Sequence, residues 1–192
     1  DTFDDCAVAA KQYTEENKMT FIPPFDDYRI IEGQGTVGVE ILEDQSDIDY
    51  LFIPVGGGGL SAGVGSYFKT YSPKTKIIGV EPEGAPSMFE ALKAGHPVTL
   101  DSIERFVDGA AVKRIGDITF SICKDVLDDM RLVPEVKICS TILKLYNEDA
   151  IVVEPAGAMS IAVLDDFAEE IKGKNIVCIV SGSNNDIDRM QE

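Results

Sequence analysis

Four consecutive glycines, Gly56 to Gly59, lie between an apolar run and an amphipathic run, and they limit the fold more than any other feature of the chain. Glycine loses more conformational freedom on folding than other residues, so four in succession must meet a structural need. Bare backbone at the carboxyl end of a parallel strand can turn several N–H groups toward one point, and the next helix adds positive charge at its N-terminus. The run therefore predicts a phosphate-binding loop that needs no lysine. A tight turn is the alternative, but one or two glycines would suffice for it.

The overall charge makes such a site harder to build. The 192 residues include 34 acidic and 17 basic ones, which gives a net charge of −17. This field disfavours nucleic acid and anionic membrane surfaces as partners, and no apolar stretch approaches the roughly 20 residues that a membrane-spanning helix needs. A bound anion must therefore be held by local donors. The four cysteines form no CxxC pair and the chain has one histidine, so we expect reduced thiols in a cytoplasmic protein and no zinc site.

Apolar runs of strand length alternate with amphipathic runs of helix length along the whole chain. The predicted strands cover residues 19–22, 49–55, 76–81 and 175–180. The predicted helices cover residues 36–43, 60–71, 86–95, 116–126, 134–147 and 155–171, and another runs to Tyr13 from a capping-box pair, Thr2 and Asp5. Because the strands are apolar on both faces, we expect a single α/β domain over residues 1–192, with a mostly parallel sheet and helices on both faces.

The glycine run also fits two other motifs. Residues 57–62 satisfy the dinucleotide-binding pattern G-x-G-x-x-A, and Glu81 ends the next strand, about where an acid that binds ribose belongs. Residues 59–63 fit the G-x-S-x-G pattern of a serine hydrolase, with Ser61 as nucleophile and His96 as the one available base. The preceding glycines spoil the sharp turn that a nucleophilic serine needs, which disfavours the hydrolase. The P-loop pattern fails because no Lys-Ser or Lys-Thr follows.

Further segments, in collinear order with the glycine run, resemble one enzyme family. They are Phe21-Ile22-Pro23-Pro24-Phe25-Asp26-Asp27 with Gly33-Gln34-Gly35-Thr36, Phe106-Val107-Asp108-Gly109-Ala110-Ala111-Val112, Glu154-Pro155-Ala156-Gly157-Ala158 and Ser181-Gly182-Ser183-Asn184-Asn185-Asp186. Together they resemble the threonine and serine dehydratases, which are fold-type II, tryptophan-synthase-β-like pyridoxal phosphate enzymes. The resemblance covers the whole chain and is strongest to the biosynthetic threonine dehydratases of the isoleucine pathway. It reduces the dinucleotide-binding hypothesis to a minor alternative.

The resemblance implies a cofactor, a reaction and a domain arrangement. The cofactor would be pyridoxal 5'-phosphate, and the complete enzyme would be a lyase that dehydrates and deaminates L-threonine to 2-oxobutanoate and ammonia, with L-serine as the other candidate substrate. The enzyme would be a cytoplasmic homo-oligomer, either a tetramer or a dimer. The chain would be part of the large domain of the tryptophan synthase β-like fold, and residues 1–20 would be the edge of a smaller domain that is missing here.

The resemblance also assigns roles to individual residues. Main-chain N–H groups would bind the cofactor phosphate at Gly56, Gly57, Gly58, Gly59 and Leu60. Ser181 would hydrogen-bond the pyridine nitrogen, while Gly109 and Glu154 are candidates for lining the active site. Glu81 could contribute to a cation site, but Ser87 stands where a second carboxylate would be needed, so no metal is predicted.

The sequence departs from the family in its catalytic lysine. No segment before Phe21 resembles the one that carries this lysine, and Lys11 and Lys18 lie in a polar helical stretch. We therefore identify no catalytic residue and expect the lysine to lie outside this chain, which would leave the chain inactive alone. A second departure is Ser183, which stands where the family usually has glycine. An NAD-binding Rossmann-type oxidoreductase domain and an inactive folding or assembly module remain as alternative functions.

Overall fold

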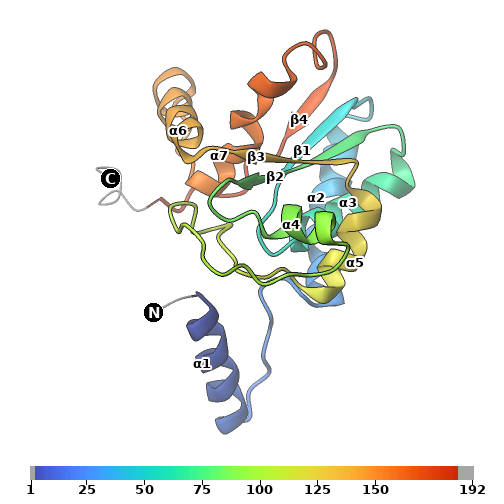
Figure 1. Cartoon of the computed structure of the whole chain (residues 1–192). Coiled ribbons are helices and arrows are strands. Elements are labelled where there is room, and N and C mark those ends of the chain that lie inside the picture. Colours follow the sequence, from blue (N-terminus) through green and yellow to red (C-terminus); the bar gives the residue numbers. More distant parts are fainter. Residues whose placement is uncertain (1–2, 186–192) are drawn as a thin grey trace.

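The computed structural model describes residues 3–185 and has a four-stranded parallel sheet at its centre (Figure 1). The strands are β1 (Tyr50–Pro54), β2 (Lys76–Pro82), β3 (Asp129–Val133) and β4 (Ile176–Cys178), in the spatial order β3-β2-β1-β4. Every neighbouring pair is parallel. Thr2 of the expected capping box and Asp186 of the last motif lie outside the described residues.

Helices fill most of the remaining chain. They are α1 (Phe3–Glu16), α2 (Tyr28–Asp44), α3 (Gly59–Tyr71), α4 (Ser87–Ala94), α5 (Asp117–Val126), α6 (Glu135–Asp149), α7 (Pro155–Ala162) and the short 3-10 helix η1 (Leu164–Phe167). None of the helices in residues 3–185 is both long enough and apolar enough to cross a membrane.

The two faces of β1 bury alternate residues under different helices. Tyr50 and Phe52 belong to a core that α6, α7 and η1 complete, and the Phe52 ring meets the Phe167 ring edge-on at a centroid distance of 5.1 Å. Leu51 and Ile53 belong to a core on the other face, together with residues of α3. All five residues of β1 are buried. The expected α/β architecture, a parallel sheet with helices on both faces, is therefore confirmed (Figure 1).

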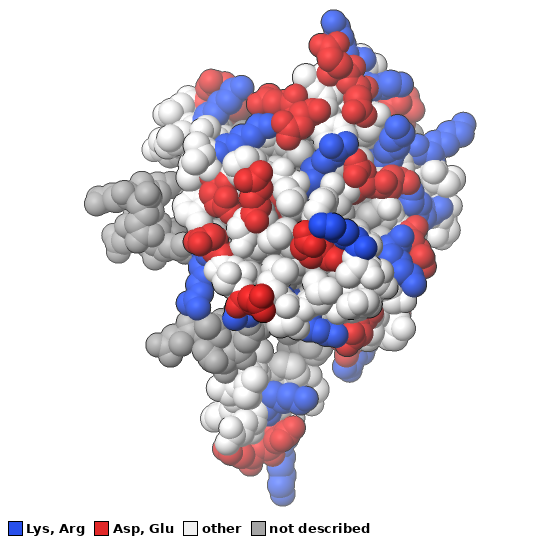
Figure 2. Space-filling model, in the orientation of Figure 1, with Lys and Arg blue, Asp and Glu red and all other residues white. Residues whose placement is uncertain are grey.

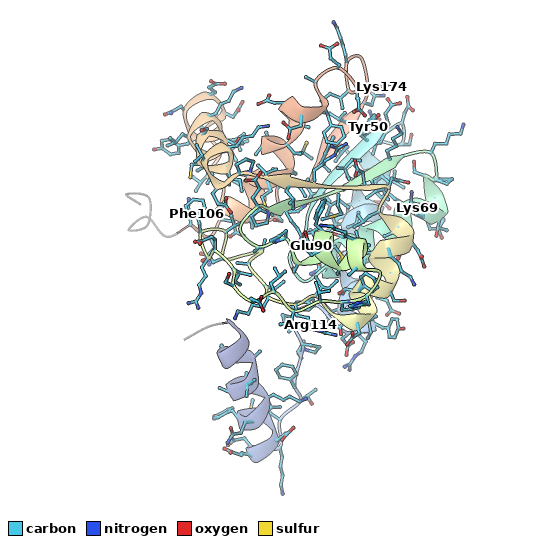
Figure 3. The ribbon with its side chains drawn as sticks, in the orientation of Figure 1. Tyr50, Lys69, Glu90, Phe106, Arg114 and Lys174 are labelled. Carbon is cyan, nitrogen blue, oxygen red and sulfur yellow. The ribbon has the colours of Figure 1, made fainter. Side chains whose placement is uncertain are left out.

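The strand register decides which segments meet at the carboxyl edge of the sheet. β1 and β4 pair Phe52 with Cys178, and the Ile179 N–H donates to the Phe52 carbonyl oxygen at 3.0 Å. Tyr50 and Lys174 mark the opposite, amino-terminal edge (Figure 3). Because β1 and β4 run in the same direction side by side, the segments that follow them leave the sheet at the same edge.

The strands differ from the prediction in two ways: one predicted strand is absent, and one strand was not predicted. Residues 19–22 form no strand: Met19 and Ile22 are exposed, so this apolar run has no neighbouring strand or core to pack against. The sequence analysis also missed β3, which is an edge strand. Only Met130 and Val133 are buried in it, and Arg131 is exposed. The strand therefore lacks the continuous apolar run by which the other strands were predicted.

The predicted helix boundaries differ most from the structure at two places. The predicted helix over residues 155–171 ends at Ala162, and the chain then tightens into η1, which carries Phe167 onto the rings of Tyr50 and Phe52. The helix predicted over residues 36–43 begins earlier, at Tyr28. Asp27 caps it, because its Oδ1 accepts the Arg29 N–H at 2.8 Å.

Glu81 is the residue before the last one of β2, and its fully buried carboxyl group caps α4. Its Oε1 accepts the Met88 N–H at 2.7 Å, and its Oε2 accepts the Phe89 N–H at 2.8 Å. The Ser87 hydroxyl donates more weakly, at 3.4 Å. These donors supply partners for a buried acid at the N-terminus of a helix that has no side-chain cap of its own.

Glu81 should make the stability of the fold fall as the pH rises. Burial raises its pKa from the ordinary 4.5 to about 8, although the hydrogen bonds from α4 act in the opposite direction. The folded chain therefore holds this proton more tightly than the unfolded chain, so the contribution is complete below pH 4.5 and disappears as the pH approaches 8. We expect Glu81→Gln to remove this component of the pH dependence, measured as the free energy of unfolding in urea between pH 5 and pH 8. An identical pH slope in the variant would contradict the assignment.

Candidate functional site

The glycine run forms the turn between β1 and α3 at the carboxyl edge of the sheet. Gly58 precedes the helix with φ of 90°, a left-handed conformation that favours glycine, and no side chain caps the helix N-terminus. Within residues 3–185, the N–H groups of residues 56–61 donate to no other group of the chain. The loop therefore offers a set of unused main-chain donors at a helix N-terminus, which is an arrangement suited to an anion.

A cleft of about 310 Å³ lies in front of this loop. Its walls include every residue that the resemblance assigned to the cofactor site or its lining, namely Gly56, Gly57, Gly58, Gly59, Leu60, Gly109, Glu154 and Ser181. These residues come from four segments that are far apart in the sequence. The structure brings the candidates together, while the role of each one stays a prediction.

The second and third glycines are needed for different reasons. A Cβ on Gly57 would overlap the ring of Phe25, which lies against the loop. A Cβ on Gly58 would come within 2.8 Å of Met88 Cε, and the positive φ would strain any other residue there. Phe25 also lines the cleft, so one aromatic ring both packs on the loop and forms part of the wall.

The carbonyl groups of the loop are held by α5 and α3. Thr119 Oγ1 donates to the Gly57 oxygen at 2.7 Å. The Gly58 oxygen accepts the Ala62 N–H at 2.9 Å and the Cys123 thiol at 3.6 Å. Burial, with a smaller effect from Glu81, raises the pKa of the Cys123 thiol to about 12, so the sulfur keeps its proton at neutral pH and can donate. The sequence analysis missed Thr119 and Cys123, because nothing near the glycines points to α5.

The α5 helix is itself capped from a distant segment. The carboxylate of Asp26 accepts the N–H groups of Asp117, Ile118 and Thr119, at distances between 2.9 and 3.1 Å. Gly116 leaves the space that this carboxylate occupies. Asp26 was part of a family motif in the sequence but had no predicted role; the structure shows that it caps the helix that supports the loop.

The opposite wall is built around Glu154, which stands at the start of α7. Its N–H donates to the Gly182 oxygen at 3.1 Å, and its Oε2 accepts the Asn184 N–H at 3.2 Å. A Cβ on Gly182 would overlap the carboxylate, and one on Gly109 would lie 3.0 Å from Oε1. Glu154 therefore holds the turn that follows Ser181, and it also lines the cleft.

The cleft has no cation of its own within the described residues. Asp108 and Glu154 are its charged lining residues, and neither Lys nor Arg is among the residues that line it. Figure 2 shows acidic and basic side chains interspersed on the face in view rather than gathered into one basic patch. An anion in the cleft would therefore depend on main-chain N–H groups.

The structure does not support the two alternative motif assignments, because their candidate residues are not placed to act. Glu81, the candidate ribose-binding acid, is fully buried with both oxygens engaged by α4, and it does not line the cleft. Ser61, the candidate nucleophile, is fully buried, while His96 is exposed in a turn and its Nδ1 lies 3.1 Å from the Pro97 oxygen. Neither the dinucleotide site nor the serine hydrolase site is formed.

Comparisons with known proteins agree on one family. The family described as pyridoxal-phosphate dependent enzyme matches residues 1–182. The chain is 62% identical over 193 residues to the L-threonine dehydratase biosynthetic IlvA of Halalkalibacterium halodurans, and 59% identical over 193 residues to that of Bacillus subtilis. All of this chain is covered in both cases, but only 46% of each relative, so the chain spans about half the length of these proteins.

Solved structures give the same picture. The processed form of threonine deaminase isoform 2 from Solanum lycopersicum superposes with a TM-score of 0.94 at 44% identity, covering 99% of this chain and 56% of that one. The maize serine racemase superposes with a TM-score of 0.89 at 32% identity, covering 96% of this chain and 57% of that one. The fold expected from the sequence is the fold of these proteins.

The glycine loop predicts a sharp response to one added methyl group. Gly57→Ala should displace Phe25 or the loop and turn the N–H groups away from the cleft, weakening the binding of inorganic phosphate about tenfold, or roughly 1.4 kcal/mol. Calorimetric titration of the chain with phosphate would measure this.

Gly33→Ala is the matched control for Gly57→Ala. Gly33 lies in α2 with nothing within 4 Å of a Cβ, so this change should keep the phosphate affinity and stabilise the fold by about 0.5–1 kcal/mol. Equal phosphate affinities for wild type and Gly57→Ala would contradict the proposed cradle.

Proposed function

Because the chain belongs to the family of pyridoxal-phosphate-dependent enzymes, we propose that it forms the cofactor-binding part of a threonine dehydratase. One observation carries the proposal: Ser181 and residues 56–59, whose N–H groups have no acceptor among the described residues, line a single cleft. The similarity to biosynthetic threonine dehydratases supports L-threonine as the substrate. The complete enzyme would convert L-threonine to 2-oxobutanoate and ammonia, as a step of isoleucine biosynthesis.

The residues of the cleft fit pyridoxal phosphate in chemistry and in size. The cofactor needs donors for a phosphate dianion, a polar partner for its ring nitrogen and apolar walls for the ring. The glycine loop supplies the first, Ser181 the second, and Ala110, Val112 and Ala156 contribute to the third. The volume of about 310 Å³ lies at the lower end of the usual range for small-molecule sites.

The chain's own residues then have distinct tasks. When bound, pyridoxal phosphate supplies the electron sink for the reaction at the amino-acid Cα. Residues 56 to 60 anchor the phosphate through main-chain N–H groups. Ser181 bonds the ring nitrogen with a hydroxyl, which, unlike a carboxylate, does not hold a proton there. A ring nitrogen held in this way would supply a weaker electron sink than a protonated one, which would favour elimination of the β-hydroxyl. Glu154 holds the Ser181 turn and lines the cleft.

The catalytic lysine would come from a segment outside this chain. No lysine lines the cleft among the described residues, and Lys11 and Lys18 are exposed. Helix α1 stands apart from the body of the molecule, with Val8 and Tyr13 exposed by 69% and 60% (Figure 1). A helix with so little of its surface buried needs a partner. We assign residues 1–20 to the edge of a second, smaller domain that would carry the lysine and pack on α1.

Two further features support the expected setting of the complete enzyme. All four cysteines are free, which fits a reducing cytoplasm.

Helix α6 exposes Val136, Leu143 and Tyr146 in addition to burying Ile138 and Ile142. An apolar surface of this kind is typical of contact between subunits, so we expect a homo-oligomer, either a dimer or a tetramer.

The proposal is tested by supplying the missing segment in trans. Mixing the chain with the separately expressed remainder of the parent protein and pyridoxal phosphate should release ammonia and 2-oxobutanoate from L-threonine, whereas neither part alone should do so. Measuring L-serine in the same assay compares the two candidate substrates.

The same mixture with the Gly57→Ala chain is the control, and its ammonia release should be reduced. If the two parts bind each other and the cofactor but release no ammonia, the chain is an inactive assembly module and the proposed function is wrong.

A further inference from the structure

The affinity of the cleft for a phosphate depends on how the loop peptides are oriented. No Lys or Arg among the described residues lines the cleft, and no side chain caps the N-terminus of α3. The donors are peptide N–H groups, and a peptide that rotates would present its carbonyl oxygen to the anion instead. Attraction would then become repulsion, so whatever holds these peptides also sets the affinity.

Thr119 is placed to hold the first of these peptides. It is fully buried, and its Oγ1 lies 2.7 Å from the Gly57 oxygen and 3.3 Å from the Gly116 oxygen. The shorter contact is the stronger one, so the hydroxyl proton is directed mainly at Gly57. A buried hydroxyl in α5 is thus used to bind a loop that lies 62 residues earlier in the chain.

Planarity of the peptide turns this contact into a constraint on a donor. In a trans peptide the C=O of one residue and the N–H of the next point in opposite directions. Because the Gly57 oxygen is held toward α5, the Gly58 N–H points away from α5. Gly58 lines the cleft and no residue of α5 does, so the side of the loop away from α5 is the side that faces the cleft. The Gly58 N–H has no acceptor among the described residues.

The Gly58–Gly59 peptide is also held by hydrogen bonds to its oxygen, but its donors are less suitable for a test by substitution. The Gly58 oxygen accepts the Ala62 N–H of α3 and the thiol of Cys123, so the Gly59 N–H also points away from the two helices. A thiol is a weak donor, and a main-chain N–H cannot be removed by a simple substitution. Thr119 is therefore the side chain through which the orientation of the loop can best be tested.

The position of Thr119 is itself fixed. Its N–H donates to Asp26 Oδ1 at 3.1 Å, within the set of bonds that caps α5. Arg114, near the start of the same helix, pairs with Asp117 at 2.7 Å (Figure 3). The residue before Asp26 is Phe25, which packs on Gly57. One short segment therefore positions both the loop and the helix that holds it.

We infer that Thr119 is a positioning residue for the cofactor phosphate: its hydroxyl holds the Gly57–Gly58 peptide so that the Gly58 N–H faces the anion. This inference rests on the proposed function for the identity of the anion. It does not depend on that function for the orientation of the peptide, which is a property of the ligand-free chain.

The test compares Thr119→Val with Thr119→Ser. Valine keeps the shape and loses the donor, and serine keeps the donor and loses the methyl group. Calorimetry with inorganic phosphate and with pyridoxal phosphate should show affinity reduced about tenfold in Thr119→Val and nearly unchanged in Thr119→Ser. The Gly58 amide resonance of the ligand-free chain should move in the valine variant and stay in place in the serine variant.

Thr75→Val is the matched control. Thr75 is also buried, and its Oγ1 donates to the Ile48 oxygen at 2.8 Å, but it precedes β2 at the amino edge of the sheet, away from the cleft. This variant should lose a comparable hydrogen bond and some stability without any change in phosphate affinity.

The outcomes separate this inference from the proposed function. If Thr119→Val leaves both the Gly58 resonance and the phosphate affinity unchanged, or if serine fails as badly as valine, the positioning role is wrong. If the resonance moves and the affinity for inorganic phosphate falls as expected, but neither the wild-type chain nor its mixture with the remainder of the protein binds pyridoxal phosphate, Thr119 still orients the loop peptide and the proposed function fails.

Discussion

The main-chain N–H groups of residues 56–59 are the constraint around which the cleft is built. The chain carries a net charge of −17, and the described lining of the cleft includes acids but no Lys or Arg. Attraction for a phosphate must therefore come from peptide dipoles and the N-terminus of α3. Such donors attract an anion only if the peptides are already oriented toward it. This explains why Phe25 packs on the loop, why Thr119 binds one of its carbonyl oxygens, and why Asp26 caps the helix that carries Thr119.

Part of this arrangement follows from the sequence. An apolar strand, a glycine run and an amphipathic helix predict a phosphate loop, because neighbouring parallel strands end at the same edge of a sheet. The expectation that Ser181 lies near the loop came instead from the resemblance to the dehydratases, because Ser181 begins one of the matching segments. The structure brings both into one cleft, since β4 pairs directly with β1. The local pattern was sufficient to predict the loop, whereas the place of Ser181 beside it depends on β4 lying next to β1, which the local pattern does not predict.

The rest depends on contacts between distant segments that leave no local pattern. Thr119 reads as an ordinary helix residue until α5 is seen to lie against Gly57. Asp26 likewise becomes a cap only once α5 is placed. The sequence also predicted features that the structure lacks. The apolar run over residues 19–22 predicts a strand, but no neighbouring strand pairs with it. The spacing of Glu81 from the glycines suggested a contact with a ligand, whereas in the structure Glu81 caps α4. Side-chain bonds to backbone atoms are decided by packing, so sequence spacing alone does not predict them.

The most direct test is a crystal structure of the complete parent protein with pyridoxal phosphate bound. We expect phosphate oxygens within about 2.7–3.2 Å of the main-chain nitrogens of residues 56–59, and the ring nitrogen within the same reach of Ser181 Oγ. The Gly57 oxygen should remain bonded to Thr119. A phosphate held elsewhere, or held by side-chain cations while the glycine N–H groups face away, would contradict the account.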